Sequence, residues 1–112
     1  MNQIKQGQNN FMPCPCCQAF VHISIRTPAD LNKAINHLQH AIRHKALQSI
    51  GHVGYASPFS ELGHNSWGDL VNNYFTCLHC GQHFELTAET YHGSGGQLKA
   101  IETRPANIIS EG

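Results

Sequence analysis

The sequence lacks any apolar run long enough to cross a membrane, and its first ten residues lack the apolar core of a signal peptide. It also lacks net charge, because seven Lys and Arg residues balance seven Asp and Glu residues. The balance gives the chain as a whole no electrostatic footprint for nucleic acid. We therefore expect a soluble protein of the cytoplasm that has no membrane partner.

Catalytic signatures are missing as well. The sequence shows no nucleophile with an adjacent base, no phosphate-binding loop and no paired carboxylates. These absences predict that the protein is not an enzyme. Its 112 residues are enough for one modest core, so we expect a single domain, residues 1–112, with a polar tail at 1–11.

What the chain does have is two C-x-x-C pairs, Cys14 with Cys17 and Cys77 with Cys80. The turn between two cysteines at this spacing points both sulfurs at one centre, and its amides hydrogen-bond to the thiolates. In a reducing compartment such pairs favour metal binding over disulfides. The sequence therefore predicts a four-cysteine site filled by structural zinc, with iron as the alternative metal.

Three neighbouring side chains leave the ligand set open. Cys16 is adjacent to Cys17, and five cysteines leave one thiol over. His79 and His83 flank the second pair and are also metal-binding types. Four cysteines already complete a tetrahedron, so we expect Cys16 to be a free thiol and both histidines to stay outside the site.

The two C-x-x-C turns, which we call knuckles, resemble those of the zinc ribbon. Zinc-ribbon knuckles read C-P-x-C and C-x-x-C-G at the tips of β-hairpins. Here they are Cys14-Pro-Cys-Cys17 and Cys77-Leu-His-Cys-Gly81. Gln18 stands where a knuckle glycine often sits, and the knuckles are farther apart than the usual separation of about 15 to 20 residues. Small bacterial proteins with a decorated zinc ribbon look like the immunity proteins that block polymorphic toxins, and this resemblance implies a toxin as partner.

Periodicity predicts the remaining elements. Residues 18–26 alternate like a half-buried strand, and Thr27 as N-cap with Pro28 begins a helix that we expect over 27–50, ended by Gly51. Residues 51–69 show no period and form a loop, followed by strands at 70–77, 82–90 and 97–104. We expect an α+β fold: a small antiparallel sheet with zinc-ribbon knuckles, and one long helix inserted between the knuckles that packs on the sheet.

The function that we expect is that of a protein–protein interaction module. Two surfaces are candidates for binding the protein partner. Aromatic side chains are common anchors of interfaces, and the loop contains three of them: Tyr55, Phe59 and Trp67. The helix face opposite the apolar stripe carries His37, His40 and His44, spaced i, i+3 and i+7. The loop aromatics have an equally simple alternative, which is to cover the open side of the core.

Two other classes remain as alternatives. Many zinc ribbons bind nucleic acid, and the cations for that role are Arg26, Lys33, Arg43 and Lys45. HNH-type metal nucleases place His and Asn residues between two C-x-x-C pairs, and the segments that resemble them are 51–53, His64-Asn65 and 69–72. Gly51 replaces the metal-binding Asp of those enzymes, so we rank the nuclease below the binding functions.

Overall fold

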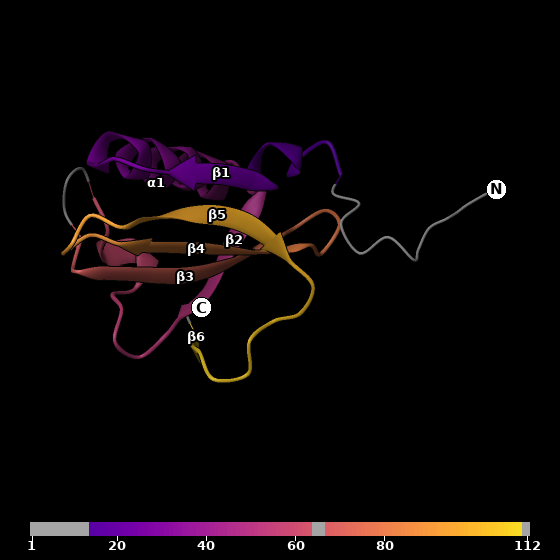
Figure 1. The fold of residues 1–112 in the computed structure, drawn as a ribbon. Coiled ribbons are helices and arrows are strands. Elements are labelled where there is room, and N and C mark those ends of the chain that lie inside the picture. The colour runs from indigo at the N-terminus through magenta and orange to yellow at the C-terminus, as the bar shows by residue number, and fades with distance from the viewer. Residues whose placement is uncertain (1–13, 64–66, 111–112) are drawn as a thin grey trace.

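The fold is that of a computed structural model, which describes residues 14–63 and 67–110. One helix lies on a six-stranded antiparallel sheet whose strand order is β1-β5-β4-β3-β2-β6 (Figure 1). The elements are η2 (Gln18–Phe20), β1 (His22–Ile25), α1 (Pro28–Arg43), β2 (Leu47–His52), η3 (Phe59–Glu61), β3 (Leu70–Cys77), β4 (His83–Glu89), β5 (Gly95–Ile101) and β6 (Ile109–Ser110). The predicted α+β class is confirmed, whereas the expected polar tail at 1–11 lies outside the described residues.

Within the described ranges, no helix has the length and apolar character needed to span a bilayer.

The start of α1 is fixed by two hydrogen bonds. The Thr27 hydroxyl accepts from the backbone N–H of Asp30 at 3.1 Å, and the Asp30 carboxylate accepts from the backbone N–H of Arg26 at 2.9 Å. These bonds satisfy backbone donors that have no partner inside the helix. The bond from Arg26 lowers the pKa of Asp30. The predicted N-cap and the predicted first residue, Pro28, are confirmed.

Replacing Thr27 with Ala should destabilise the protein by about 1 kcal/mol, because the cap bond to the Asp30 N–H is lost. Urea denaturation of the two proteins measures the difference. Thr27→Ser keeps the hydroxyl and is the matched control, so it should retain most of the stability. Equal losses in both variants would show that the bond contributes nothing.

The end of α1 differs from the prediction, because the helix stops at Arg43 and residues 47–52 form β2. Lys45 adopts a positive φ of 63°, and the bonds from Ala46 N to Ala41 O and from Lys45 N to Ile42 O close a Schellman turn. Gly51 is therefore no C-cap. It lies in β2 under the C-terminal segment, where a Cβ would come within 2.6 Å of the Ile109 carbonyl oxygen.

The core lies between α1 and one face of the sheet. In β4, Phe84, Leu86 and Ala88 are buried while the residues between them are half-buried, as period-2 alternation predicts. Phe75 of β3 is fully buried and meets Phe59 edge-on, with ring centroids 5.0 Å apart. The other face of these strands is mostly polar, apart from Leu70 and Tyr74 of β3, and carries no helix (Figure 1).

The position of the helix corrects a second expectation. In the chain α1 joins β1 to β2, and β1 separates it from the first knuckle while β2 and β3 separate it from the second. The helix is thus part of the sheet's own connectivity and is not an insertion placed between the knuckles. β1 pairs with β5, so the first strand of the chain is held in the sheet by hydrogen bonds to a strand near the other end of the chain. Prediction from periodicity also missed β6, whose two residues are too few to show a period.

The β4–β5 turn is held by one carboxylate. Glu89 accepts hydrogen bonds from the backbone N–H groups of His92, at 2.7 Å, and Ser94, at 3.2 Å. The bond from the His92 N–H is the main reason that the pKa of Glu89 falls to about 2.

We expect Glu89→Gln to be less stable than the parent protein at pH 7, and the difference to shrink as the pH falls from about 4.5 to 2. A carboxyl with a lowered folded-state pKa contributes stability above its unfolded pKa and loses it as the folded group is protonated. Urea unfolding of both proteins at several pH values measures the difference between their free energies of unfolding. Comparing the two proteins at equal pH cancels the effects that they share. Glu61→Gln, at an exposed site, is the control. A difference independent of pH would contradict the assignment.

Candidate metal centre

The first knuckle is a tight turn fixed to the core. The backbone N–H of Cys17 donates to the Cys14 carbonyl at 3.1 Å, and the N–H of Phe20 donates to the Cys17 carbonyl at 3.0 Å. Phe20 is buried, and its ring meets Phe84 edge-on with centroids 6.2 Å apart. The apolar side chain that follows the pair therefore fixes the position of both sulfurs.

The second knuckle lies at the tip of the β3–β4 hairpin. Cys77 N donates to Gln82 O at 2.8 Å, and Gly81 N donates to Cys77 O at 3.0 Å. Gly81 has a φ of 81°, a conformation in which a side chain would be strained. The N–H of His79 points at the Cys77 sulfur at 3.4 Å, which is the amide-to-thiolate bond expected of such a turn. Among the described residues only this knuckle is on a β-hairpin, since the first leads into η2.

Two further contacts hold the second knuckle, and no pattern in the sequence predicts either of them. The N–H of Leu78 donates to the carbonyl of Ala46, just beyond the end of α1, at 3.0 Å. The side-chain amide of Gln82 donates to Ile101 O at the end of β5, at 2.8 Å. The helix end, the hairpin and β5 therefore meet at the same end of the molecule as the cysteines.

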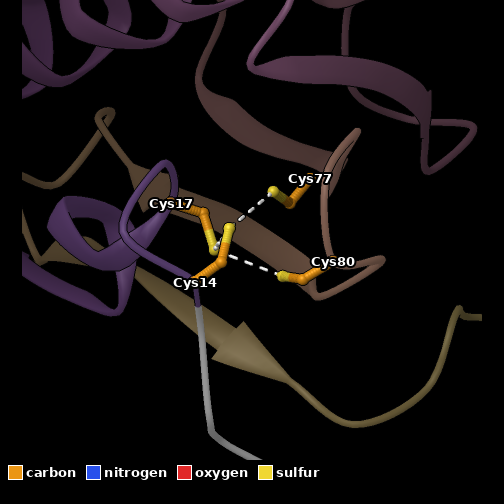
Figure 2. Close-up of side chains that lie close together, drawn as sticks. All are labelled: Cys14, Cys17, Cys77 and Cys80. Carbon is orange, nitrogen blue, oxygen red and sulfur yellow. Dashed lines mark hydrogen bonds between the residues drawn. The ribbon is translucent and has the colours of Figure 1, made fainter.

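The four sulfurs converge on one point, as Figure 2 shows for the two loops that carry them. All lie within 4.8 Å of one another. The Cys14 sulfur is 3.9 Å from that of Cys17 and 3.6 Å from that of Cys77, and the sulfurs of Cys17 and Cys80 are also 3.6 Å apart. Four sulfurs about 2.3 Å from a central zinc form a tetrahedron with edges of about 3.8 Å, so the donor set fits such an ion.

The same distances exclude disulfides, in which the sulfurs are about 2.05 Å apart, and all five cysteines are free. Burial raises the pKa of Cys17 and of Cys77. For Cys14 burial acts in the same direction, but hydrogen bonds with Cys77 and with the backbone at Cys16 outweigh it and lower the pKa to about 6. Four thiolates this close repel one another, so a divalent cation is the group that would allow all four to ionise.

The three side chains that left the ligand set open lie elsewhere. Cys16 and His79 are exposed, and neither belongs to the converging group. His83 is on the polar face of β4, where its Nδ1 is 2.8 Å from the Thr76 hydroxyl. Among the described residues, the group of three or more such side chains that can hold a metal ion such as zinc consists of the four cysteines of the two C-x-x-C pairs.

The candidate partner-binding aromatics divide into three environments. Phe59 is buried against Phe75, so it supports the core and is not available as an interface anchor. Trp67 is half-buried and packs against the core. Tyr55 is 70 % exposed and lines a shallow groove of about 210 Å³ with Leu70, which is also exposed. Leu70 is a surface residue that sequence reasoning assigned only to a strand.

The helix histidines are all exposed, at positions 37, 40 and 44. The ring of His37 packs on Phe20, with centroids 4.7 Å apart, while those of His40 and His44 pack on each other at 4.1 Å. The four cations proposed for nucleic acid, Arg26, Lys33, Arg43 and Lys45, are exposed too. Of the nuclease-like segments, His52 is buried with its Nδ1 bonded to the Val53 carbonyl, and His64-Asn65 lies outside the described residues.

No family model, no curated protein and no solved structure matches the chain.

Proposed function

We propose that the protein is a non-catalytic interaction module held together by a structural zinc ion at Cys14, Cys17, Cys77 and Cys80. The observation that supports the metal site is the convergence of the four sulfurs within 4.8 Å, with three of their separations, 3.6 to 3.9 Å, close to the edges of a zinc–thiolate tetrahedron. A site with four protein ligands leaves no open position for water or substrate, and closed sites of this kind are structural.

The role of the ion is to join two turns that lie far apart in the chain. The first knuckle precedes β1 at one edge of the sheet, and the second is the turn between the central strands β3 and β4. Cys77 follows Cys17 by 60 positions in the chain. A shared metal ion fixes both turns at once, and because the unfolded chain has no such site, its binding free energy adds to the stability of the fold.

Substitution with Co²⁺ tests the ligand set. Cobalt in four thiolates is expected to give intense ligand-to-metal charge-transfer absorption in the near ultraviolet and d–d bands in the visible, typical of tetrahedral coordination. Cys80→Ser should reduce the charge-transfer intensity by about one quarter if four sulfurs bind, whereas Cys16→Ser should leave it unchanged. A spectrum of octahedral Co²⁺ without charge transfer would contradict the site.

The second half of the proposal is a protein ligand. Its support is the exposed pair Tyr55 and Leu70 beside the groove on the face of the sheet that carries no helix. Large exposed apolar side chains next to a hollow are the usual anchors of protein partners. The finer form of this proposal, taken from the zinc-ribbon resemblance, is that the partner is a toxin and the protein its immunity factor.

Comparing Tyr55→Ala with Tyr91→Ala tests this surface, because both tyrosines are about equally exposed but only Tyr55 lines the groove. In affinity capture from the native host, proteins recovered with the parent and with Tyr91→Ala should be lost with Tyr55→Ala. If Tyr55→Ala recovers the same proteins as the parent, the groove is not the docking surface. Co-expression with a toxin-like neighbouring gene tests the finer proposal, since protection of the cells is the expected result.

Nucleic-acid binding stays as a second candidate because Lys33, Arg43 and Lys45 are exposed on or just beyond α1, whereas the acidic residues concentrate in the second half of the chain. Binding driven by phosphate contacts weakens steeply as salt rises. Mobility shifts with single- and double-stranded oligonucleotides at low ionic strength decide the matter. Absence of binding there removes this candidate.

A further inference from the structure

The last turn of α1 carries two imidazoles packed against each other. His40 lies in the last turn of the helix and His44 is its C-cap, four residues later, so the two side chains lie on the same side of the helix end. Their ring centroids are 4.1 Å apart and the rings are tilted by 35°. Both side chains are exposed to solvent.

The hydrogen bonding of His44 fixes which nitrogen is free. Its Nδ1 lies 2.9 Å from the backbone carbonyl oxygen of His40, and a carbonyl only accepts, so Nδ1 carries the proton. In the neutral ring the lone pair is then on Nε2. A histidine that donates one ring N–H to a backbone carbonyl and keeps the other nitrogen free has the arrangement found in metal-binding histidines.

The packing of the rings brings both side chains within reach of one shared ion. Two imidazole nitrogens each about 2.0 to 2.1 Å from a tetrahedral Zn²⁺ are about 3.4 Å apart, and the two ring centroids are then about 5 Å apart. The rings, whose centroids are 4.1 Å apart, must therefore separate by about 1 Å and turn one nitrogen each toward the ion, and both side chains are exposed enough to do so. His37 is not a third ligand, because its ring packs on Phe20 at 4.7 Å. Water would complete the coordination, as the site is open to solvent.

We propose that His40 and His44 form a second metal site, separate from the four cysteines, that binds a borderline divalent ion of the zinc, nickel and copper class through two imidazoles. Imidazole suits these ions, whereas Mg²⁺ and Ca²⁺ prefer oxygen ligands and are excluded. The site lies at the cysteine end of the molecule, because Ala46, two residues beyond His44, bonds to Leu78 of the second knuckle. The nearby charges of Arg43 and Lys45 oppose a cation, so binding is weaker here than at the thiolates.

Calorimetric titration of the purified protein with ZnCl₂, in a buffer that does not chelate metals, tests the site. Protein that already carries its cysteine-bound ion should take up one further equivalent, while MgCl₂ gives no signal. His40→Ala and His44→Ala should each weaken the second binding step by at least about tenfold, the loss seen when even a supporting residue of a metal site is removed. His92→Ala, at an exposed histidine on the β4–β5 turn, is the matched control and should change nothing.

Histidine side-chain NMR gives a second readout that does not depend on stoichiometry. Addition of Zn²⁺ should shift the Nε2 resonances of His40 and His44 first, and Cys16→Ser should leave those shifts unchanged. The proposal is overturned if no further equivalent binds, or if the second step has the same affinity in the His40→Ala/His44→Ala double variant. Binding of phosphate in place of Zn²⁺ at these histidines would also overturn it, because the face would then be an anion site.

Discussion

Cys77→Ser is expected to lose its metal and its cooperative thermal transition together. Cys77 is almost fully buried, and its sulfur lies 3.6 Å from that of Cys14 on the other knuckle. Structural zinc binds small domains with apparent free energies of about 10 to 16 kcal/mol at neutral pH, which is comparable to the entire stability of a typical domain, about 5 to 15 kcal/mol. Metal analysis and far-ultraviolet circular dichroism during heating measure the two losses.

Cys16→Ser separates this effect from the general cost of removing a thiol. Cys16 is exposed and outside the converging group, so the variant should keep its metal and melt within a few degrees of the parent protein. A chelator strong enough to strip zinc should lower the melting temperature of the parent and of Cys16→Ser alike. If Cys77→Ser melts like Cys16→Ser, the ion makes no contribution to the fold.

Phe75→Ala should destabilise the protein by about 3 to 5 kcal/mol even with the metal bound. The Phe75 ring is fully buried between the sheet and α1 and meets Phe59 edge-on, so truncation removes its burial and leaves a cavity. Urea unfolding in the presence of excess Zn²⁺ measures the change. Tyr55→Ala also truncates an aromatic ring but at a site that is 70 % exposed, so it should cost less than about 0.5 kcal/mol. Similar losses in the two variants would contradict the assignment of the core.

The sequence predicted those features that depend on local chemistry. The cap of α1 needs a hydroxyl at Thr27 and a proline after it, and both are local. The bounds of β3 came out as predicted, and those of β4 within a residue, because alternating burial leaves a period-2 pattern in the sequence. The grouping of the two C-x-x-C pairs also followed from spacing, since neither pair alone can complete a tetrahedron.

Features that depend on distant parts of the chain were missed. Residues 44–50 continue the apolar pattern of the helix, yet pairing of Leu47 with Cys77 draws them into the sheet after a left-handed turn at Lys45. No glycine marks that turn. The different environments of the loop aromatics were missed for the same reason. Only the packed structure shows that Phe59 is buried against Phe75 while Tyr55 stays at the surface.

The stacking of His40 on His44 lies between these two cases. The i, i+4 spacing was visible in the sequence, but the bond from the His44 ring to the His40 carbonyl, which decides the free nitrogen, was not. The sequence alone therefore predicted only a polar helix face. The structure shows that His40 and His44 pack on each other, whereas His37 packs on Phe20.

The most direct test of the central claim is the metal content of the protein purified without chelator or affinity tag, measured by elemental analysis and by native mass spectrometry. Both methods should find one tightly held zinc ion per chain, because the four cysteines release their protons and bind the metal as thiolates. The same measurement on Cys77→Ser should find none. Less than about half an equivalent of zinc or iron in the parent protein, under conditions where it is folded, would contradict the four-cysteine site.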